Sequence, residues 1–190
     1  MTSGFGIGRS WPMATVEEVR KYPQSLPRPQ SPDAATAVTP REEVALFATA
    51  FSLVAGMIHA VAAVIHFGEI WWYGALFTLL ACFQMGWAAQ LYRRPTKSLL
   101  GAGILVSLGT VAVWVISRTA GLPVGPGAWK PESVGALDIA ATLDELAIIA
   151  LALALLRDSV EWIGAASMRL AVYAALTVTG VPLFLGGGPH

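Results

Sequence analysis

The chain contains little charge and almost no cysteine. Of its 190 residues, 13% are charged and one, Cys82, is a cysteine, whereas a soluble domain carries roughly a quarter charged residues. A single cysteine excludes an intramolecular disulfide framework and any CxxC metal or haem-attachment motif. The formal net charge is zero, so electrostatics give no support to a nucleic-acid partner.

Common catalytic motifs are also absent. The sequence has no GxSxG nucleophile elbow, no P-loop, no HExxH zinc motif and no GxGxxG that follows a strand. It shows no convincing internal repeat, which disfavours a transporter built from inverted repeats. No reaction is therefore indicated by a motif, and any function must be sought in the placement of individual polar residues.

The chain is rich in long apolar runs. Hydrophobic residues make up 55% of it, and the mean hydropathy is +0.62. Runs of about 20 residues, the length that crosses a bilayer, lie at about 44–66, 71–92, 98–117, 135–156 and 169–186. The predicted fold class is an all-α, polytopic transmembrane helix bundle of five spans. Gly180 and Pro182 interrupt the fifth run, so four spans are the alternative.

The first 42 residues differ from the rest in composition. They are rich in proline, glycine, serine and charge, and they lack the apolar core of a signal peptide. Such a segment buries too little apolar surface to offset its chain entropy. We expect residues 1–42 to form a disordered cytoplasmic tail and residues 43–190 to form the transmembrane domain. The alternative is an arm that orders against a partner subunit.

The distribution of Lys and Arg predicts the orientation. The tail and the link Arg93–Lys97 are basic, and Arg157 follows the fourth span, whereas the link 67–70 has no Lys or Arg. Cytoplasmic loops carry the excess of basic residues. We therefore expect a multi-pass protein of the bacterial cytoplasmic membrane, with the N-terminus inside and, for five spans, the C-terminus outside.

Two pairs of ionisable residues lie within the apolar runs. His59 and His66 share one face of the first span, and Asp138 and Glu145 share one face of the fourth. Ionisable groups at membrane depth are a functional-site hypothesis by default. In the predicted topology His66 and Asp138 lie near the outer surface, and His59 and Glu145 lie about 10 Å deeper. Neighbouring spans would then form two stacked layers of histidine facing carboxylate.

Further polar residues are expected to support this site from the outer rim or from within the bundle. They are Glu69, Gln84, Arg118 and Thr142. The link 117–126 is dense in glycine and proline, which predicts a shaped loop. This loop is either a plain connector or a cap over the outer mouth of the bundle, in which Arg118 pairs with Glu69, Glu132 or Asp138.

Several chemistries remain open for the four central residues. Histidine with Asp or Glu is a common ligand set for zinc, copper or iron. Two histidines seven residues apart lie about 10 Å from each other, so we expect one metal per layer, or one histidine with carboxylates. Haem is less favoured, because two histidines on one helix cannot flank it. Chains of His, Asp and Glu also form proton relays, and a quinone pocket is conceivable.

Residues 45 to 156 resemble a set of small multi-span membrane proteins from GC-rich bacteria. The segments that carry this resemblance are Gly56–His59, His66, Trp71–Gly74, Gln84, Trp114–Pro126, Glu132–Gly135 and Asp138–Glu145. The resemblance implies the multi-span architecture and carries over no activity.

Two functions are consistent with these observations. The first is an integral membrane protein with an outward-facing intramembrane His/carboxylate pocket, which binds a metal ion or supports redox or proton chemistry. The second is a non-catalytic accessory subunit of a larger membrane complex, docked through its N-terminal tail. In the second case the buried polar pairs serve only to specify helix packing.

Overall fold

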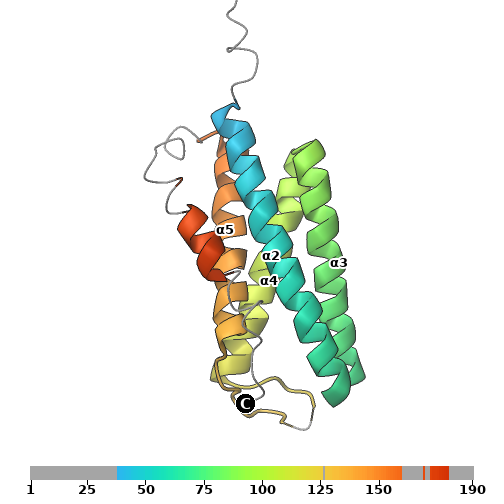
Figure 1. Ribbon diagram of the computed structural model, residues 1–190. Helices are drawn as coiled ribbons and strands as arrows, with labels where there is room; N and C mark the ends of the chain where they lie inside the picture. The colour runs from blue at the N-terminus through green and yellow to red at the C-terminus, as the bar shows by residue number, and fades with distance from the viewer. Residues whose placement is uncertain (1–37, 126, 160–168, 170–171, 180–190) are drawn as a thin grey trace, which may run out of the picture. The chain divides into compact units, whose positions relative to one another are not determined.

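Four long helices make up most of the part of the chain that the computed structural model describes, which is residues 38–125, 127–159, 169 and 172–179 (Figure 1). They are α2 (Pro40–Glu69), α3 (Trp71–Arg93), α4 (Lys97–Thr119) and α5 (Ala136–Arg157). All four are long and apolar enough to cross a membrane, which confirms the first four predicted spans and supports a multi-pass membrane protein.

The predicted N-terminal tail and the predicted fifth span lie partly outside the described residues. Residues 1–37 of the predicted tail lie outside them, and α2 begins at Pro40, before the predicted boundary at residue 43. Within the predicted fifth span, 169–186, the structure describes residues 169 and 172–179, which are helical. Five spans and a disordered tail therefore stay predictions.

Local sequence signals set the helix ends. The Thr39 hydroxyl accepts a hydrogen bond from the Glu42 N–H at 3.3 Å, and the Glu42 carboxylate accepts one from the Thr39 N–H at 2.8 Å. This reciprocal capping box begins α2. The residue before a proline is pushed out of the helical region, and Arg94, before Pro95, is extended and ends α3. Thr96 then caps α4.

The helices run up and down as two hairpins, α2–α3 and α4–α5, that meet along α2 and α5 (Figure 1). A single extended residue, Ile70, joins α2 to α3. In contrast, α3 and α4 contact each other only to a limited extent. We call the end with Ile70 and the loop 120–135 the loop end, and the end where α2 begins the tail end.

The apolar core lies toward the tail end of the bundle. It joins the first half of α2 to the last parts of α3 and α5 and to the start of α4. Its largest members are Phe47, Phe51, Trp87, Leu91, Leu100, Ile148, Leu151 and Leu155. The Trp87 indole Nε1–H donates to the Leu99 carbonyl at 2.7 Å and so closes the α3–α4 hairpin there. The tail end is therefore tightly packed.

Gly103 gives Trp87 the space it needs. A Cβ at position 103 would lie 2.5 Å from Trp87 ring atoms, whereas a Cβ at Gly101, on the same helix, would meet nothing within 4 Å. We expect Gly103→Ala to lower the free energy of unfolding by about 2 kcal/mol through overpacking. Gly101→Ala is the control and should be neutral or slightly stabilising. Equal denaturation curves for the two variants would contradict this packing.

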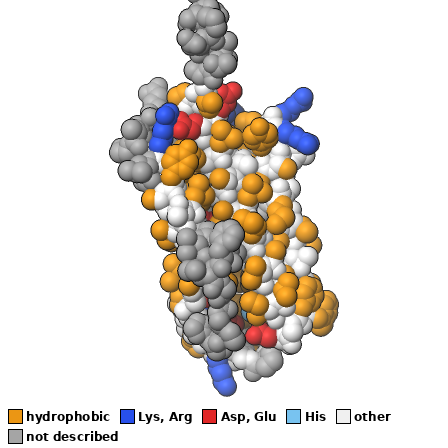
Figure 2. Space-filling model, viewed as in Figure 1, with side chains coloured by type: hydrophobic (Ala, Val, Ile, Leu, Met, Phe, Trp, Pro, Cys, Tyr) orange, Lys and Arg blue, Asp and Glu red, His pale blue; other side chains and the backbone are white. Residues whose placement is uncertain are grey.

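The surface is typical of a protein in a bilayer. Hydrophobic side chains cover the middle of the visible face, and Lys and Arg side chains lie toward its two ends (Figure 2). Val64, Leu79 and Leu105 are among the most exposed large hydrophobic side chains. We interpret this belt as the lipid-facing surface. Which end faces the cytoplasm stays a prediction from the Lys and Arg distribution.

Candidate functional site

A cavity of about 360 Å³ lies between the helices, toward the loop end. All four helices and the loop 120–135 contribute to its walls, which are mainly apolar. Both predicted pairs, His59 with His66 and Asp138 with Glu145, line it. The bundle is thus filled by an apolar core at one end and is hollow at the other.

His59, Gln84 and Glu145 form a buried network, of which His59 and Glu145 line this cavity. The His59 Nε2 lies 3.2 Å from the Glu145 Oε1, and the Gln84 Nε2–H donates to the same oxygen at 2.5 Å. The three side chains come from α2, α3 and α5, and the residues are 3%, 2% and 0% exposed. A buried carboxylate is costly unless it is paired or protonated, and two donors on one oxygen offset that cost.

The two oxygens of the Glu145 carboxylate differ in their hydrogen bonding. Among the described residues neither the Glu145 Oε2 nor the Gln84 Oε1 has a hydrogen-bond partner. One carboxylate oxygen is therefore held by two neighbours, and the other is buried and unpaired among the described residues, on a side chain that lines the cavity.

Phe77 separates the two histidines. Its ring stacks on His66 at a centroid distance of 4.9 Å and an interplanar angle of 12°, and on His59 at 5.7 Å and 27°. An apolar ring between them prevents both imidazoles from binding one small ion. Phe77 was not predicted from the sequence, although a signal existed. Because one residue, Ile70, joins α2 to α3, position 77 of α3 lies at the same depth as position 63 of α2, and Ala63 lies between the two histidines.

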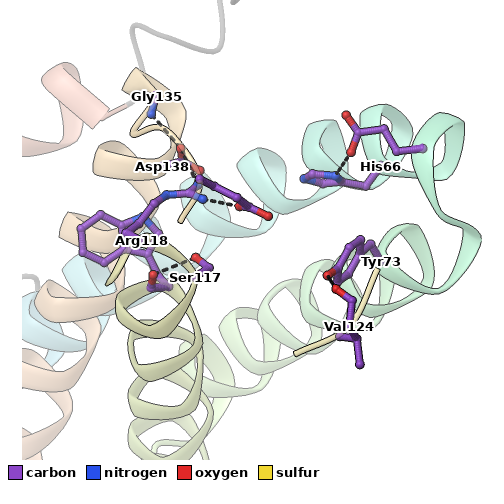
Figure 3. Close-up of polar contacts among 10 residues, drawn as sticks. His66, Tyr73, Ser117, Arg118, Val124, Gly135 and Asp138 are labelled. Carbon is purple, nitrogen blue, oxygen red and sulfur yellow. Dashed lines mark hydrogen bonds and ion pairs between the residues drawn. The ribbon is translucent and has the colours of Figure 1, made fainter. Parts of the chain in front are cut away.

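The predicted contact between His66 and Asp138 is not formed. The His66 Nδ1 lies 2.8 Å from the Glu69 Oε2 on its own helix. The Asp138 Oδ2 forms an ion pair with the Arg118 Nη2 and accepts a hydrogen bond from the Gly135 N–H, each at 2.8 Å. Figure 3 shows Arg118 with Asp138 on one side and His66 on the other. Because His66 and Asp138 each contact another residue, the predicted outer layer of histidine facing carboxylate consists of two separate pairs.

Arg118 ties the loop to the helices. Besides Asp138 it contacts Glu132, through its Nη1, and these two are among the partners predicted from the sequence. The third predicted partner, Glu69, contacts His66 instead. The guanidinium therefore joins α4, the loop and the start of α5 at the rim of the cavity.

The loop 120–135 is a folded segment, as its glycine and proline content predicted. Gly121 has a φ of +75°, and a Cβ there would lie 2.4 Å from the Lys130 nitrogen. The Trp129 N–H donates to the Leu122 carbonyl at 2.9 Å. The Tyr73 hydroxyl donates to the Val124 carbonyl at 2.9 Å (Figure 3). These contacts hold the loop across the loop end of the helices.

The remaining acidic and hydroxyl residues of α5 have different roles. The Thr142 hydroxyl donates to the Asp138 carbonyl of its own helix at 2.8 Å while Thr142 lines the cavity. Asp144 does not line it. Its carboxylate is fully buried, has no hydrogen-bond partner among the described residues and lies close to Thr179, whose hydroxyl donates to the Leu176 carbonyl.

The cavity opens sideways between α3 and α4. Leu76 of α3 and Val113 of α4 line it and are nevertheless 42% and 45% exposed. Gly109 of α4 also lines it, is exposed and has nothing near its missing Cβ. These residues lie within candidate spans. A molecule dissolved in the bilayer could therefore enter where α3 and α4 are in limited contact.

The predicted metal ion stays a prediction. In the described part of the chain, no three or more His, Cys, Asp or Glu side chains gather as a metal site would require. His59 and Glu145 supply two ligands, whereas catalytic zinc sites use three protein ligands.

Comparisons with known protein families, with curated proteins and with solved structures found no match to the chain. The site must therefore be interpreted from its own geometry.

Proposed function

We propose that this integral membrane protein binds a small, largely apolar molecule inside the bilayer and exchanges a proton with it. The observation that carries the proposal is the cavity of about 360 Å³, lined by His59 and Glu145, with Gln84 bonded to Glu145 behind them. Small-molecule sites have volumes of about 300–1,000 Å³ and mostly apolar walls with a few placed polar groups. This cavity fits that description.

The buried network supports the proton exchange. Proton transfer needs an acceptor near the bound molecule, and Glu145, which lines the cavity, has an oxygen, Oε2, without a partner among the described residues. His59 and Gln84 hold the other oxygen and so fix the orientation of the carboxylate. This is the proton chemistry predicted from the paired ionisable residues, now assigned to the inner pair alone.

Filling the cavity tests the proposal. Ala141 lines it, so we expect Ala141→Phe to abolish saturable binding of the neutral fluorophore 1-aminoanthracene to protein in lipid nanodiscs. Naphthalene should displace the probe from the wild type, and empty nanodiscs give the lipid background. Ala102→Phe, at an exposed position of α4 outside the cavity, is the matched control and should bind as the wild type does. Equal saturable binding by all three proteins, or none by the wild type, would refute the proposal.

The two other predicted functions have less support. Metal binding lacks a three-ligand cluster among the described residues. An accessory subunit docked through its tail depends on residues 1–42, most of which lie outside the described part.

A further inference from the structure

The cavity has a second polar region, which belongs to α4 and which the proton exchange does not use. Trp114 and Arg118 both line the cavity, and they lie four residues apart, on one face of the helix. The Trp114 Nε1 and the Arg118 Nε are buried and have no hydrogen-bond partner within the described residues. Both atoms are N–H donors only.

Two buried donors without partners are costly in a protein. A buried donor without an acceptor loses its hydration and gains nothing in return, and most buried polar groups are paired. Trp87 shows the ordinary case in this chain, since its Nε1–H donates to the Leu99 carbonyl at 2.7 Å. The Trp114 and Arg118 donors therefore lack an acceptor among the described residues, and a bound molecule would supply one.

The charges around these donors indicate which acceptor fits. Arg118 is already paired with two carboxylates, those of Glu132 and Asp138, and Glu145 adds a third acidic group to the lining. An anionic head group would be repelled by these three acidic side chains, because it would lie close to them in a medium of low dielectric constant. A neutral oxygen, such as a carbonyl, accepts from the same donors without that repulsion.

We infer that Trp114 and Arg118 form a subsite for the carbonyl oxygen of a neutral, apolar ligand that enters between α3 and α4. The inference rests on the proposed function, because it assigns the ligand class of the same cavity. Sequence reasoning missed Trp114, although its position one helical turn before Arg118 was a visible signal.

Three ring-matched probes test this assignment by equilibrium dialysis of protein in nanodiscs against empty nanodiscs. They are naphthalene, which has no acceptor, 1,4-naphthoquinone, which has neutral carbonyl oxygens, and 2-naphthoate, which is an anion. We expect the wild type to bind the quinone about tenfold more tightly than naphthalene, because hydrogen bonds to two unpartnered donors are gained. The anion should bind no better than naphthalene.

Substitution of the donors provides the second arm. Trp114→Phe keeps an aromatic ring and removes the N–H, and Arg118→Lys keeps the charge and removes the Nε–H. Each should lower the ratio of quinone affinity to naphthalene affinity about threefold to tenfold, and this ratio cancels the change in apolar contact that both probes share. Trp71→Phe is the matched control, since Trp71 is exposed and does not line the cavity, and it should bind all probes as the wild type does.

The outcomes separate this inference from the proposed function. Equal affinity for quinone and naphthalene, unchanged by Trp114→Phe, would overturn the subsite while the cavity itself still binds. Tightest binding of 2-naphthoate would overturn the neutral ligand class. Failure of the wild type to bind any of the three probes would refute the proposed function as well.

Discussion

Glu145→Ala is expected to destabilise the protein more than any other single change in the polar network. The Glu145 Oε1 is the shared partner of His59 and Gln84, so its removal leaves two buried donors without an acceptor. Each unsatisfied group costs about 1–3 kcal/mol, and we expect a total loss of about 3 kcal/mol. For a chain of this size that lowers the melting temperature by roughly 10 °C.

Glu145→Gln separates hydrogen bonding from charge. The glutamine keeps a carbonyl oxygen that can accept from the His59 and Gln84 side chains, so we expect a loss of about 1 kcal/mol. Glu132→Ala, which removes a half-exposed loop carboxylate, should cost under 1 kcal/mol. The measurement is thermal unfolding in one detergent. Identical melting temperatures for Glu145→Ala and Glu145→Gln would contradict the network.

Gly109→Trp is expected to slow entry into the cavity by tenfold or more. Gly109 lines the cavity at its opening between α3 and α4, and nothing lies within 4 Å of a Cβ built there. An indole at this position would cover the opening and leave the cavity behind it intact. The helix itself should tolerate the change, because glycine is the poorest helix former after proline.

The control for this variant lies on the same helix. Gly101 is also exposed with open space around its Cβ, but it does not line the cavity. We expect Gly101→Trp to leave the association rate of 1-aminoanthracene, measured by stopped-flow fluorescence in nanodiscs, as in the wild type. Equal rates for Gly101→Trp and Gly109→Trp would show that ligands do not enter between α3 and α4.

The sequence predicted the helices well because their signals are local. Apolar length predicted the four candidate spans. The helix ends at Thr39, Pro95 and Thr96 also depend only on neighbouring residues, although the prediction did not use these signals and placed the first boundary at residue 43. The small residues Ser52, Gly56 and Ala63 share the face of α2 that carries His59 and are buried with it, and Ser52 donates to the Gln84 carbonyl at 2.9 Å.

The site was predictable only in part, because side-chain partners depend on the tertiary arrangement. Matching depth brought His59 and Glu145 into one layer, and the structure places them in contact. The same comparison of depths predicted a contact between His66 and Asp138. It did not consider the partners within one helical turn, which are Glu69 for His66 and Gly135 for Asp138. The limited contact between α3 and α4, which opens the cavity, is a property of four helices together and has no signature in any one of them.

The most direct test of the central claim is to locate a bound molecule. Crystals of the protein soaked with 1-bromonaphthalene would report the position of the bromine by anomalous diffraction. The account predicts a peak inside the cavity, between the His59–Gln84–Glu145 network and the opening that Leu76 and Val113 flank. Bromine peaks confined to the lipid-facing surface, with none in the cavity, would contradict it.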